Sequence, residues 1–234
     1  MLPIPVLPIR AEGLSWRAGQ VAILADVSLT IAAGPPLLII GPNGAGKSVL
    51  LRLLHGLLPP AAGRITPAAP IRGAMVFQRP VLLRRSALAN IRYPLALAGV
   101  PRAARGERAA AALAQVGLAA LAHRPARLLS GGEQQRLALA RAVALAPPVL
   151  FLDEPCASLD PAATRAVEEI VAGIAAAGCK IVMTTHDLGQ ARRLAGEVVF
   201  LHRGRVLEAA PADRFFAGPA SAEAAAFLQG ELLW

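Results

Sequence analysis

Eight consecutive residues near the start of the chain have the types and spacing needed to hold a row of phosphate groups. They match the pattern G-x-x-x-x-G-K-[ST] in full and read Gly41-Pro42-Asn43-Gly44-Ala45-Gly46-Lys47-Ser48. Glycines let a backbone curl around an anion, so that successive N–H groups point at it. In this pattern the lysine reaches the β- and γ-phosphates, and the following hydroxyl ligates Mg²⁺. The segment therefore predicts a site for the phosphates of a nucleotide such as ATP, with Mg²⁺ beside it, a loop that many kinases and GTPases share.

The choice of lysine inside this segment supports the prediction. The chain has 24 basic residues, of which only Lys47 and Lys180 are lysines. A compact ammonium fits between phosphate oxygens where a planar guanidinium is too wide. We interpret Lys47 as a phosphate ligand and Lys180 as an ordinary residue at the start of a strand.

A pair of acids supplies the second half of a metal and water site. Asp153 and Glu154 directly follow the apolar run Val149–Leu152. A carboxylate at the end of a buried strand is a suitable Mg²⁺ ligand, and its neighbour points to the other side. We predict that Asp153 holds the metal, together with Ser48, and that Glu154 polarises the attacking water.

A second glycine-containing segment reads Leu129-Ser130-Gly131-Gly132-Glu133-Gln134-Gln135-Arg136. Ser130 and Glu133 have the spacing of a capping box at a helix start. Gly131 and Gly132 would leave backbone donors of that helix exposed. This segment predicts a second anion site, about 85 residues after the first in the sequence.

The elements around these residues alternate between strands and helices, which predicts an α/β fold with a parallel sheet. Five short apolar runs predict buried strands, at Leu37–Ile40, Met75–Phe77, Val149–Leu152, Ile181–Thr184 and Val198–Leu201. Helical periodicity follows at Ser48–Leu57, Glu133–Leu145, Thr164–Ala176 and Leu188–Leu194. The alternating region Val21–Ile31 predicts a small antiparallel sheet. The alanine- and arginine-rich stretch after Gln78 predicts inserted helices.

Composition argues against other classes of protein. The net charge is +9, but the arginines are spread along the chain and only 4% of residues are aromatic, so we expect no nucleic-acid binding. The longest uncharged run, Val27–Gly46, is interrupted by glycines and prolines, so we expect no membrane span. Cys156 and Cys179 are interpreted as reduced thiols that pack as small apolar residues.

With these motifs in this order, the chain resembles the ATP-binding subunits of ABC transporters over nearly its whole length. The resemblance implies a P-loop NTPase (RecA-like) parallel-sheet core, an N-terminal antiparallel β subdomain and an inserted helical subdomain. It implies a single domain over residues 1–234. The core lobe would span about residues 1–78 and 145–234, and the helical subdomain about 79–144.

The resemblance also assigns roles to residues that carry no motif of their own. Trp16 matches the aromatic residue that stacks on adenine, and Gln78 matches the glutamine that senses the metal and the attacking water. Ser158 and Asp160 match the loop that crosses to a partner subunit. His186 matches the histidine that contacts the γ-phosphate. The other histidines, His55, His123 and His202, are interpreted as incidental.

In such a family, two subunits pack head to tail, so the resemblance implies a homodimer. Ser130, Gly131 and Gly132 of one subunit, with Glu133, would cap the ATP held by Gly41–Ser48 of the other. Glu154 would be the general base, while Lys47, Gln78 and His186 would complete the catalytic set. The transmembrane permease would be a separate polypeptide, fed by an extracytoplasmic substrate-binding protein. The chain would then lie peripherally on the cytoplasmic face of a bacterial inner membrane.

Two stretches, Arg79–Ser86 and Ala157–Pro161, look like those of tungstate and related oxyanion importers. The alternative is the ATPase of an exporter or a lipoprotein-release system, which shares every motif and differs mainly in its permease. A soluble ABC protein of translation or DNA repair would have paired cassettes or a long coiled-coil insertion, and neither is present. A nucleotide kinase would share the phosphate loop but would have no use for Ser130–Glu133.

Overall fold

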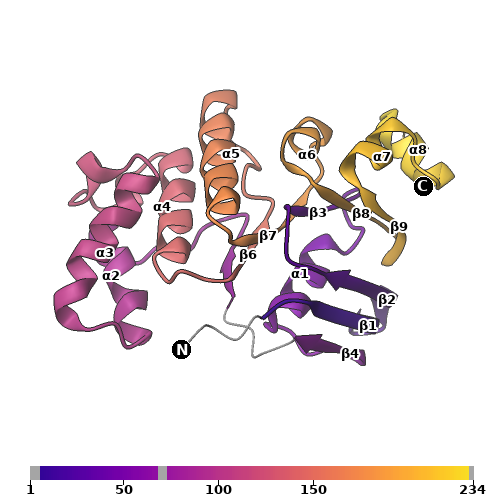
Figure 1. Cartoon of the computed structure of the whole chain (residues 1–234), viewed down its shortest axis with the longest axis horizontal. Coiled ribbons are helices and arrows are strands. Elements are labelled where there is room, and N and C mark those ends of the chain that lie inside the picture. Colours follow the sequence, from indigo (N-terminus) through magenta and orange to yellow (C-terminus); the bar gives the residue numbers. More distant parts are fainter. Residues whose placement is uncertain (1–5, 68–72, 232–234) are drawn as a thin grey trace. The chain divides into compact units, whose positions relative to one another are not determined.

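The chain divides into two compact units in a computed structural model that describes residues 6–67 and 73–231 (Figure 1). The first unit comprises Met1–Gly73 and Lys180–Trp234, and the second comprises Ala74–Cys179. The stretch 79–144, predicted as a helical subdomain, lies within the second unit. That unit also contains one strand before the stretch, and one strand and one further helix after it.

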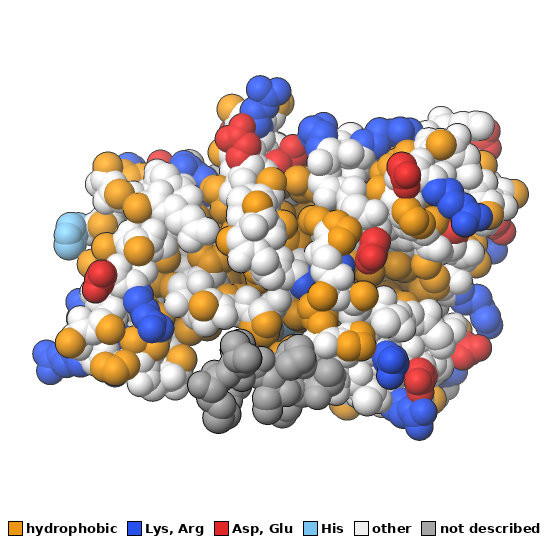
Figure 2. Space-filling view, in the orientation of Figure 1, with side chains coloured by type: hydrophobic (Ala, Val, Ile, Leu, Met, Phe, Trp, Pro, Cys, Tyr) orange, Lys and Arg blue, Asp and Glu red, His pale blue; other side chains and the backbone are white. Residues whose placement is uncertain are grey.

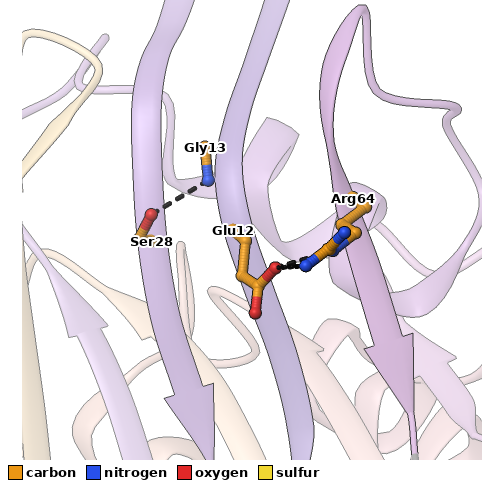
Figure 3. Close-up of polar contacts among 4 residues, drawn as sticks. All are labelled: Glu12, Gly13, Ser28 and Arg64. Atoms are coloured by element: carbon orange, nitrogen blue, oxygen red, sulfur yellow. Dashed lines mark hydrogen bonds and ion pairs between the residues drawn. The ribbon is translucent and has the colours of Figure 1, made fainter.

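The first unit contains the expected antiparallel sheet. Its strands are β1 (Ile9–Ala18), β2 (Val21–Ile31) and β4 (Ala62–Pro67), in the order β2-β1-β4. Polar contacts tie β1 to both neighbours: the Gly13 N–H donates to Ser28 Oγ at 2.9 Å, and Arg64 pairs with Glu12 at 2.6 Å (Figure 3). The Arg64–Glu12 pair is exposed, so it contributes little, and the buried side chains of the opposite face hold the sheet together.

The first unit also contains a parallel sheet. The central strand β3 (Leu37–Ile40) is fully buried and pairs in parallel with β7 (Lys180–Thr185) and β8 (Glu197–His202). β9 (Arg205–Pro211) closes the edge antiparallel to β8. The helices of this unit are α1 (Lys47–His55), α6 (Leu188–Leu194), α7 (Ala212–Ala217) and α8 (Ala222–Leu228). Strands buried on both faces have continuous apolar sequences, which is why the apolar runs located β3, β7 and β8.

The second unit is mainly helical. It contains two parallel strands, β5 (Ala74–Val76) and β6 (Val149–Asp153), and the helices α2 (Ala87–Leu97), α3 (Arg102–Gln115), α4 (Gly131–Val143) and α5 (Pro161–Ala176). Two short 3₁₀ turns lie at Ala119–Leu121 and Ala126–Leu128. α4 contacts α2, α3, α5 and β5, so it is the central helix of the unit. Its buried residues are leucines and alanines together with Gln135.

Lys180 is not the ordinary strand residue that the sequence suggested. It is 2% exposed, and its ammonium donates to the Pro35 carbonyl and pairs with the Glu197 carboxylate at 3.4 Å. Burial lowers the pKa of Lys180, and the charge of Glu197 opposes that shift. The lysine therefore ties the beginnings of β7 and β8 to the segment before β3. Its partners lie 145 and 17 residues away, so the sequence near Lys180 carries no sign of them.

The surface fits the charge pattern of the sequence. Figure 2 shows Lys and Arg side chains scattered over the face in view, among many hydrophobic ones. No helix within residues 6–67 and 73–231 combines the length and the apolar character needed to cross a membrane.

Candidate functional site

The phosphate loop joins β3 to α1 and leaves the start of α1 open. Gly46 is the N-cap residue, with a left-handed φ of 101°, and no side chain caps the helix. The first turn of α1 contains no acidic residue. The first N–H groups of a helix have no partner within the helix and carry a partial positive charge. The start of α1 is thus arranged to receive an anion.

The fold requires glycine at the first position of the loop. Gly41 has a φ of 150°, and a Cβ added there would lie 2.0 Å from the backbone oxygen of Leu201. The turn after Leu201 holds the loop from the same side, because the Gly204 N–H donates to the Ala45 carbonyl at 3.1 Å. No local sequence pattern indicates this support, since the turn between β8 and β9 carries no motif.

Lys47 is buried and its ammonium folds back over the loop. Its Nζ donates to the carbonyl oxygens of Gly41 at 2.9 Å and Pro42 at 3.1 Å. The charge is therefore held in the concavity that the loop encloses. Phosphate oxygens arriving there would be charged acceptors, which form stronger hydrogen bonds than neutral carbonyls.

Two further predicted residues lie beside the loop in the same unit. Trp16 is half-buried on β1 and is paired with Leu24 of β2, whose side chain would lie 2.8 Å from a Cβ added at Gly46. His186 follows β7, which is in register with β3 so that Thr185 lies opposite Ile40. Gly41 and the exposed His186 therefore emerge side by side at the carboxyl edge of the sheet, where α/β proteins bind ligands.

The second unit brings together the acids and Gln78. Asp153 is buried at the end of β6, and Glu154 follows it with a left-handed φ of 44°. Val76 of β5 lies opposite Leu152, so Gln78 and Glu154 leave the same edge of this strand pair. Non-glycine residues in left-handed geometry are strained and gather at functional sites. The strain at Glu154 supports its assignment as a functional acid.

The predicted capping box is present at the start of α4. The Glu133 N–H donates to Ser130 Oγ at 3.3 Å, and the Ser130 N–H donates to Glu133 Oε2 at 2.7 Å. Gly132 lies against α5, where an added Cβ would be 2.8 Å from the Cβ of Ala163. The capping box therefore satisfies the N–H groups of Ser130 and Glu133, and the start of α4 packs closely on α5.

Ser130–Glu133 and the loop Ser158–Asp160 line one pocket of about 440 Å³. Ser158 has a left-handed φ of 65°. Asp160 caps α5, with its Oδ1 accepting from the Ala163 N–H at 2.9 Å. The two segments that the resemblance assigned to contact with a partner subunit are thus brought together on one surface.

The donor set suits Mg²⁺ carried by a nucleotide. Ser48 of the first unit, and Asp153 and Gln78 of the second, offer hydroxyl, carboxylate and amide oxygens. Within the described ranges, no three His, Cys, Asp or Glu side chains gather as a metal cage. Mg²⁺ is usually held by one or two protein oxygens together with substrate phosphates and water, so the oxygen types that each unit offers by itself suit the ion.

Comparison with known proteins gives a consistent result. The model of the family described as ABC transporter matches residues 24–157. A phosphate import ATP-binding protein of Natronomonas pharaonis is 39% identical over 97% of this chain and 88% of its own length. A taurine import ATP-binding protein of Pseudomonas entomophila is 40% identical over 91% of this chain and 87% of its own length. A methionine import ATP-binding protein of Nocardia farcinica is 39% identical over 97% of this chain and 74% of its own length.

Solved structures share the fold. The cbiO1 protein of Clostridium perfringens, part of an ABC transporter complex, has a TM-score of 0.80 at 27% identity, covering 89% of this chain and 90% of that protein. A dimeric ATP-binding cassette in a post-hydrolysis state, bound to ADP and Pi, has a TM-score of 0.77 at 26% identity. The match covers 87% of this chain and 98% of that protein. The predicted α/β P-loop fold is confirmed.

Proposed function

Because this chain belongs to the ABC transporter family, whose ATP-binding proteins hydrolyse ATP with Mg²⁺, we propose that it is the subunit that powers a bacterial importer. The relatives described above are named as import ATP-binding proteins for phosphate, methionine and taurine. Their names favour import over the alternative of an exporter or a lipoprotein-release system.

The observation that carries the proposal is a phosphate loop at the uncapped start of α1, with the buried Lys47 ammonium folded back over it. The phosphate loop belongs to the first unit, and the pocket of Ser130–Glu133 and Ser158–Asp160 belongs to the second. Each chain has one of each. Two copies arranged head to tail would complete two sites, so the working form is a homodimer in which Ser130 and Gly131 cap the ATP of the other copy.

The residues then divide the chemistry among them. Lys47 and the start of α1 neutralise the phosphates, and Trp16 stacks on the adenine. Ser48, Asp153 and Gln78 hold the metal, which supplies charge stabilisation when bound. Glu154 takes the proton of the attacking water, and His186 stabilises the γ-phosphate. Catalysis is mainly positioning and electrostatics, as in other phosphoryl transfers.

The test of this assignment is Glu154→Gln. The amide retains the shape but cannot take a proton, so we expect ATP turnover to fall by at least about 100-fold. ATP binding should persist, and ATP should now hold the chain as a stable dimer in analytical ultracentrifugation. The control is Glu154→Gln/Lys47→Ala, which should stay monomeric with ATP. Near-normal turnover in Glu154→Gln would remove Glu154 from this role.

We further propose that the chain sits peripherally on the cytoplasmic face of a membrane. Its partners would be separate integral-membrane permease subunits and an extracytoplasmic substrate-binding protein. These partners predict co-purification with an integral membrane protein. Consistent failure to recover one from membrane extracts would contradict the proposal.

The finer proposal is that the substrate is tungstate or a related oxyanion. It rests on Arg79–Ser86 and Ala157–Pro161, and on the phosphate importer among the relatives. The test is the ATPase activity of the reconstituted complex with its binding protein loaded with tungstate, molybdate, phosphate or sulfate. Stimulation by one of these anions supports the oxyanion class. Stimulation by methionine or taurine alone would contradict it.

A further inference from the structure

The two-residue turn between β8 and β9 contacts two parts of the candidate ATP site at once. It consists of Arg203 and Gly204, which separate the two strands. Gly204 is buried, and its N–H donates to the Ala45 carbonyl of the phosphate loop at 3.1 Å. The Gly204 carbonyl accepts from the Ala25 N–H of β2 at 2.9 Å. One residue therefore connects the phosphate loop to the antiparallel sheet through both of its backbone polar groups.

The turn and the phosphate loop also pack against the same peptide of β2. A Cβ added at Gly204 would lie 2.4 Å from the Ile23 carbonyl oxygen and 3.1 Å from the Leu24 Cα. A Cβ added at Gly46 would lie 3.0 Å from the same Ile23 oxygen and 2.8 Å from a methyl carbon of Leu24. The peptide that joins Ile23 to Leu24 is therefore in close contact with both glycines, and neither contact leaves room for a side chain.

The hairpin by itself would not require glycine at position 204. Arg203 and Gly204 have φ values of 46° and 74°, so both are left-handed, as in two-residue turns of type I′. Asparagine and aspartate also tolerate this conformation. The Ile23 oxygen excludes them here, because every residue other than glycine has a Cβ. The close approach to β2 is therefore what requires glycine.

β2 extends this connection to the residue predicted to stack on adenine. Trp16 of β1 is paired with Leu24 directly across the antiparallel sheet. Directly paired residues lie on the same face of a sheet, so Trp16 shares the face on which Leu24 approaches Gly46. Leu24 is fully buried, so packing fixes its position. The distance from Trp16 to the phosphate loop therefore depends on how β2 is held.

We propose that Gly204 is a positioning residue for the base of the nucleotide. By holding β2 close to the phosphate loop, it sets the distance between Trp16 and the loop, so that one ligand contacts both. A nucleoside triphosphate gains both contacts, whereas inorganic tripolyphosphate contacts only the loop. The inference rests on the proposed function, because it takes Trp16 as the surface that stacks on the base.

Substitution of Gly204 tests this role through the difference between two ligands. In Gly204→Ala the new Cβ meets a backbone oxygen that cannot rotate away, so the turn and β2 must separate. We expect the affinity for ATP to fall about tenfold, the scale of a lost base–aromatic stack, and the affinity for tripolyphosphate to change by less than about twofold. Competition calorimetry on the full chain at low protein concentration measures both affinities. An equal loss for the two ligands, or no loss for either, would overturn the inference.

Gly19 offers a matched control in the same hairpin as Trp16. It lies in the two-residue turn between β1 and β2 and has a φ of 59°. Among the described residues, no heavy atom lies within 4 Å of a Cβ built at Gly19, leaving aside its chain neighbours. Gly19→Ala therefore adds similar backbone strain without a clash, and both affinities should stay within about twofold of wild type. A tenfold loss of ATP affinity in Gly19→Ala would attribute the effect to strain in the sheet and overturn the inference.

A double-mutant cycle with Trp16 shows whether the effect of Gly204 passes through the base. In Trp16→Ala the base has no aromatic surface, so adding Gly204→Ala should weaken ATP binding by less than about twofold further. A further loss of about tenfold would mean that Gly204 affects ATP by another route, and the inference would fail.

Hydrogen exchange in the wild-type chain keeps the inference testable if Gly204→Ala does not fold. Nuclear magnetic resonance follows the amides of Ala25 and Gly204 one by one. ATP should slow the exchange of both, because it contacts both sides of the connection. Tripolyphosphate should slow only that of Gly204, whose N–H donates to the phosphate loop. Equal slowing of the Ala25 amide by the two ligands would overturn the inference.

The outcomes separate this inference from the proposed function. If the wild-type chain hydrolyses ATP but Gly204→Ala loses both ligands equally, the inference fails and the proposed function stands. If Trp16→Ala leaves the ATP affinity unchanged, the inference again fails alone, because the base then binds elsewhere. If the wild-type chain neither binds nor hydrolyses ATP, both fail.

Discussion

The two glycine-containing helix starts are built in opposite ways. α1 begins at Gly46, in left-handed geometry, with no capping side chain and no acid in its first turn. α4 begins at Ser130 in extended geometry and is capped by Ser130 and Glu133. The first helix start carries a buried ammonium, and the second carries a carboxylate.

This difference predicts different roles for the two helix starts in an ATP site that two copies of the chain would share. The start of α1 has no capping side chain and no acid in its first turn, so we expect a single chain to bind phosphates there. The start of α4 is stable without a ligand, so its contribution depends on the approach of a second copy. We infer that nucleotide affinity comes mainly from the phosphate loop, and that the response to dimerisation comes from Ser130–Glu133.

The largest expected effect contrasts the glycines of the two segments. Gly41→Ala puts a Cβ 2.0 Å from a backbone oxygen at a φ of 150°, and should cost about 4 kcal/mol of unfolding free energy. Gly131→Ala meets its nearest atom at 3.9 Å and should change that free energy by less than about 1 kcal/mol. Urea unfolding measures both.

A milder variant applies if Gly41→Ala does not fold. Gly44 has a φ of 80° but open space around it, so Gly44→Ala should lose about 1 kcal/mol from backbone strain alone. Equal losses for the alanine variants of Gly41 and Gly131 would mean that the phosphate loop is no more constrained than the start of α4.

The next effect concerns ATP affinity in single chains. Lys47→Ala removes the charge that faces the phosphates and should weaken ATP binding by about 100-fold. Lys47→Arg should also bind poorly, because the guanidinium is too wide for the concavity. Ser130→Ala should leave the affinity of monomers for ATP within about twofold. Calorimetry at low protein concentration measures the ATP affinity of all three variants. An equal loss of ATP affinity in Ser130→Ala would contradict the assignment of nucleotide affinity to the phosphate loop.

How much of this could be predicted from the sequence depends on the range of the interactions. The capping box of Ser130 and Glu133 and the strand Leu37–Ile40 are encoded within a few residues, so local patterns located them. Long-range contacts had no local signal. The oxygen of Leu201 that requires glycine at position 41 is an example, as is the pairing of Lys180 with Pro35 and Glu197.

A pocket of the second unit was missed for a related reason; it is lined by Arg84, Arg85, Ser86, His123, Pro125 and Arg127. Its arginines lie in two segments that only the hydrogen bonds among positions 83–90 and 122–126 bring together. In the sequence these arginines look like part of an even spread of charge. The edge strand β9 was missed too, because its residues alternate between exposed and half-buried and form no apolar run.

A smaller effect measures the cap of α4. Ser130→Ala removes the acceptor for the Glu133 N–H and should cost about 1 kcal/mol of unfolding free energy. Ser221→Ala, which removes the equivalent cap of α8, should cost a similar amount. Only Ser130→Ala should also lower the ATPase rate at protein concentrations that favour the dimer. A loss of rate in both variants would attribute the effect to stability instead of ATP contact.

The smallest effect tests the charge at the start of α4. Glu133→Gln keeps an acceptor for the Ser130 N–H but removes a negative charge from the surface that meets the partner's ATP. The helix should lose about 0.5 kcal/mol, since an acid in the first turn favours the helix dipole. Glu223→Gln, in the first turn of α8, should lose a similar amount. ATP-driven dimerisation can be measured for both variants in the Glu154→Gln background by analytical ultracentrifugation. It should strengthen about threefold for Glu133→Gln and stay unchanged for Glu223→Gln. Only Glu133→Gln removes repulsion between a carboxylate and the γ-phosphate. Weaker dimerisation in Glu133→Gln would mean that the Glu133 carboxylate makes a favourable contact in the dimer. Glu133 would then do more than cap α4.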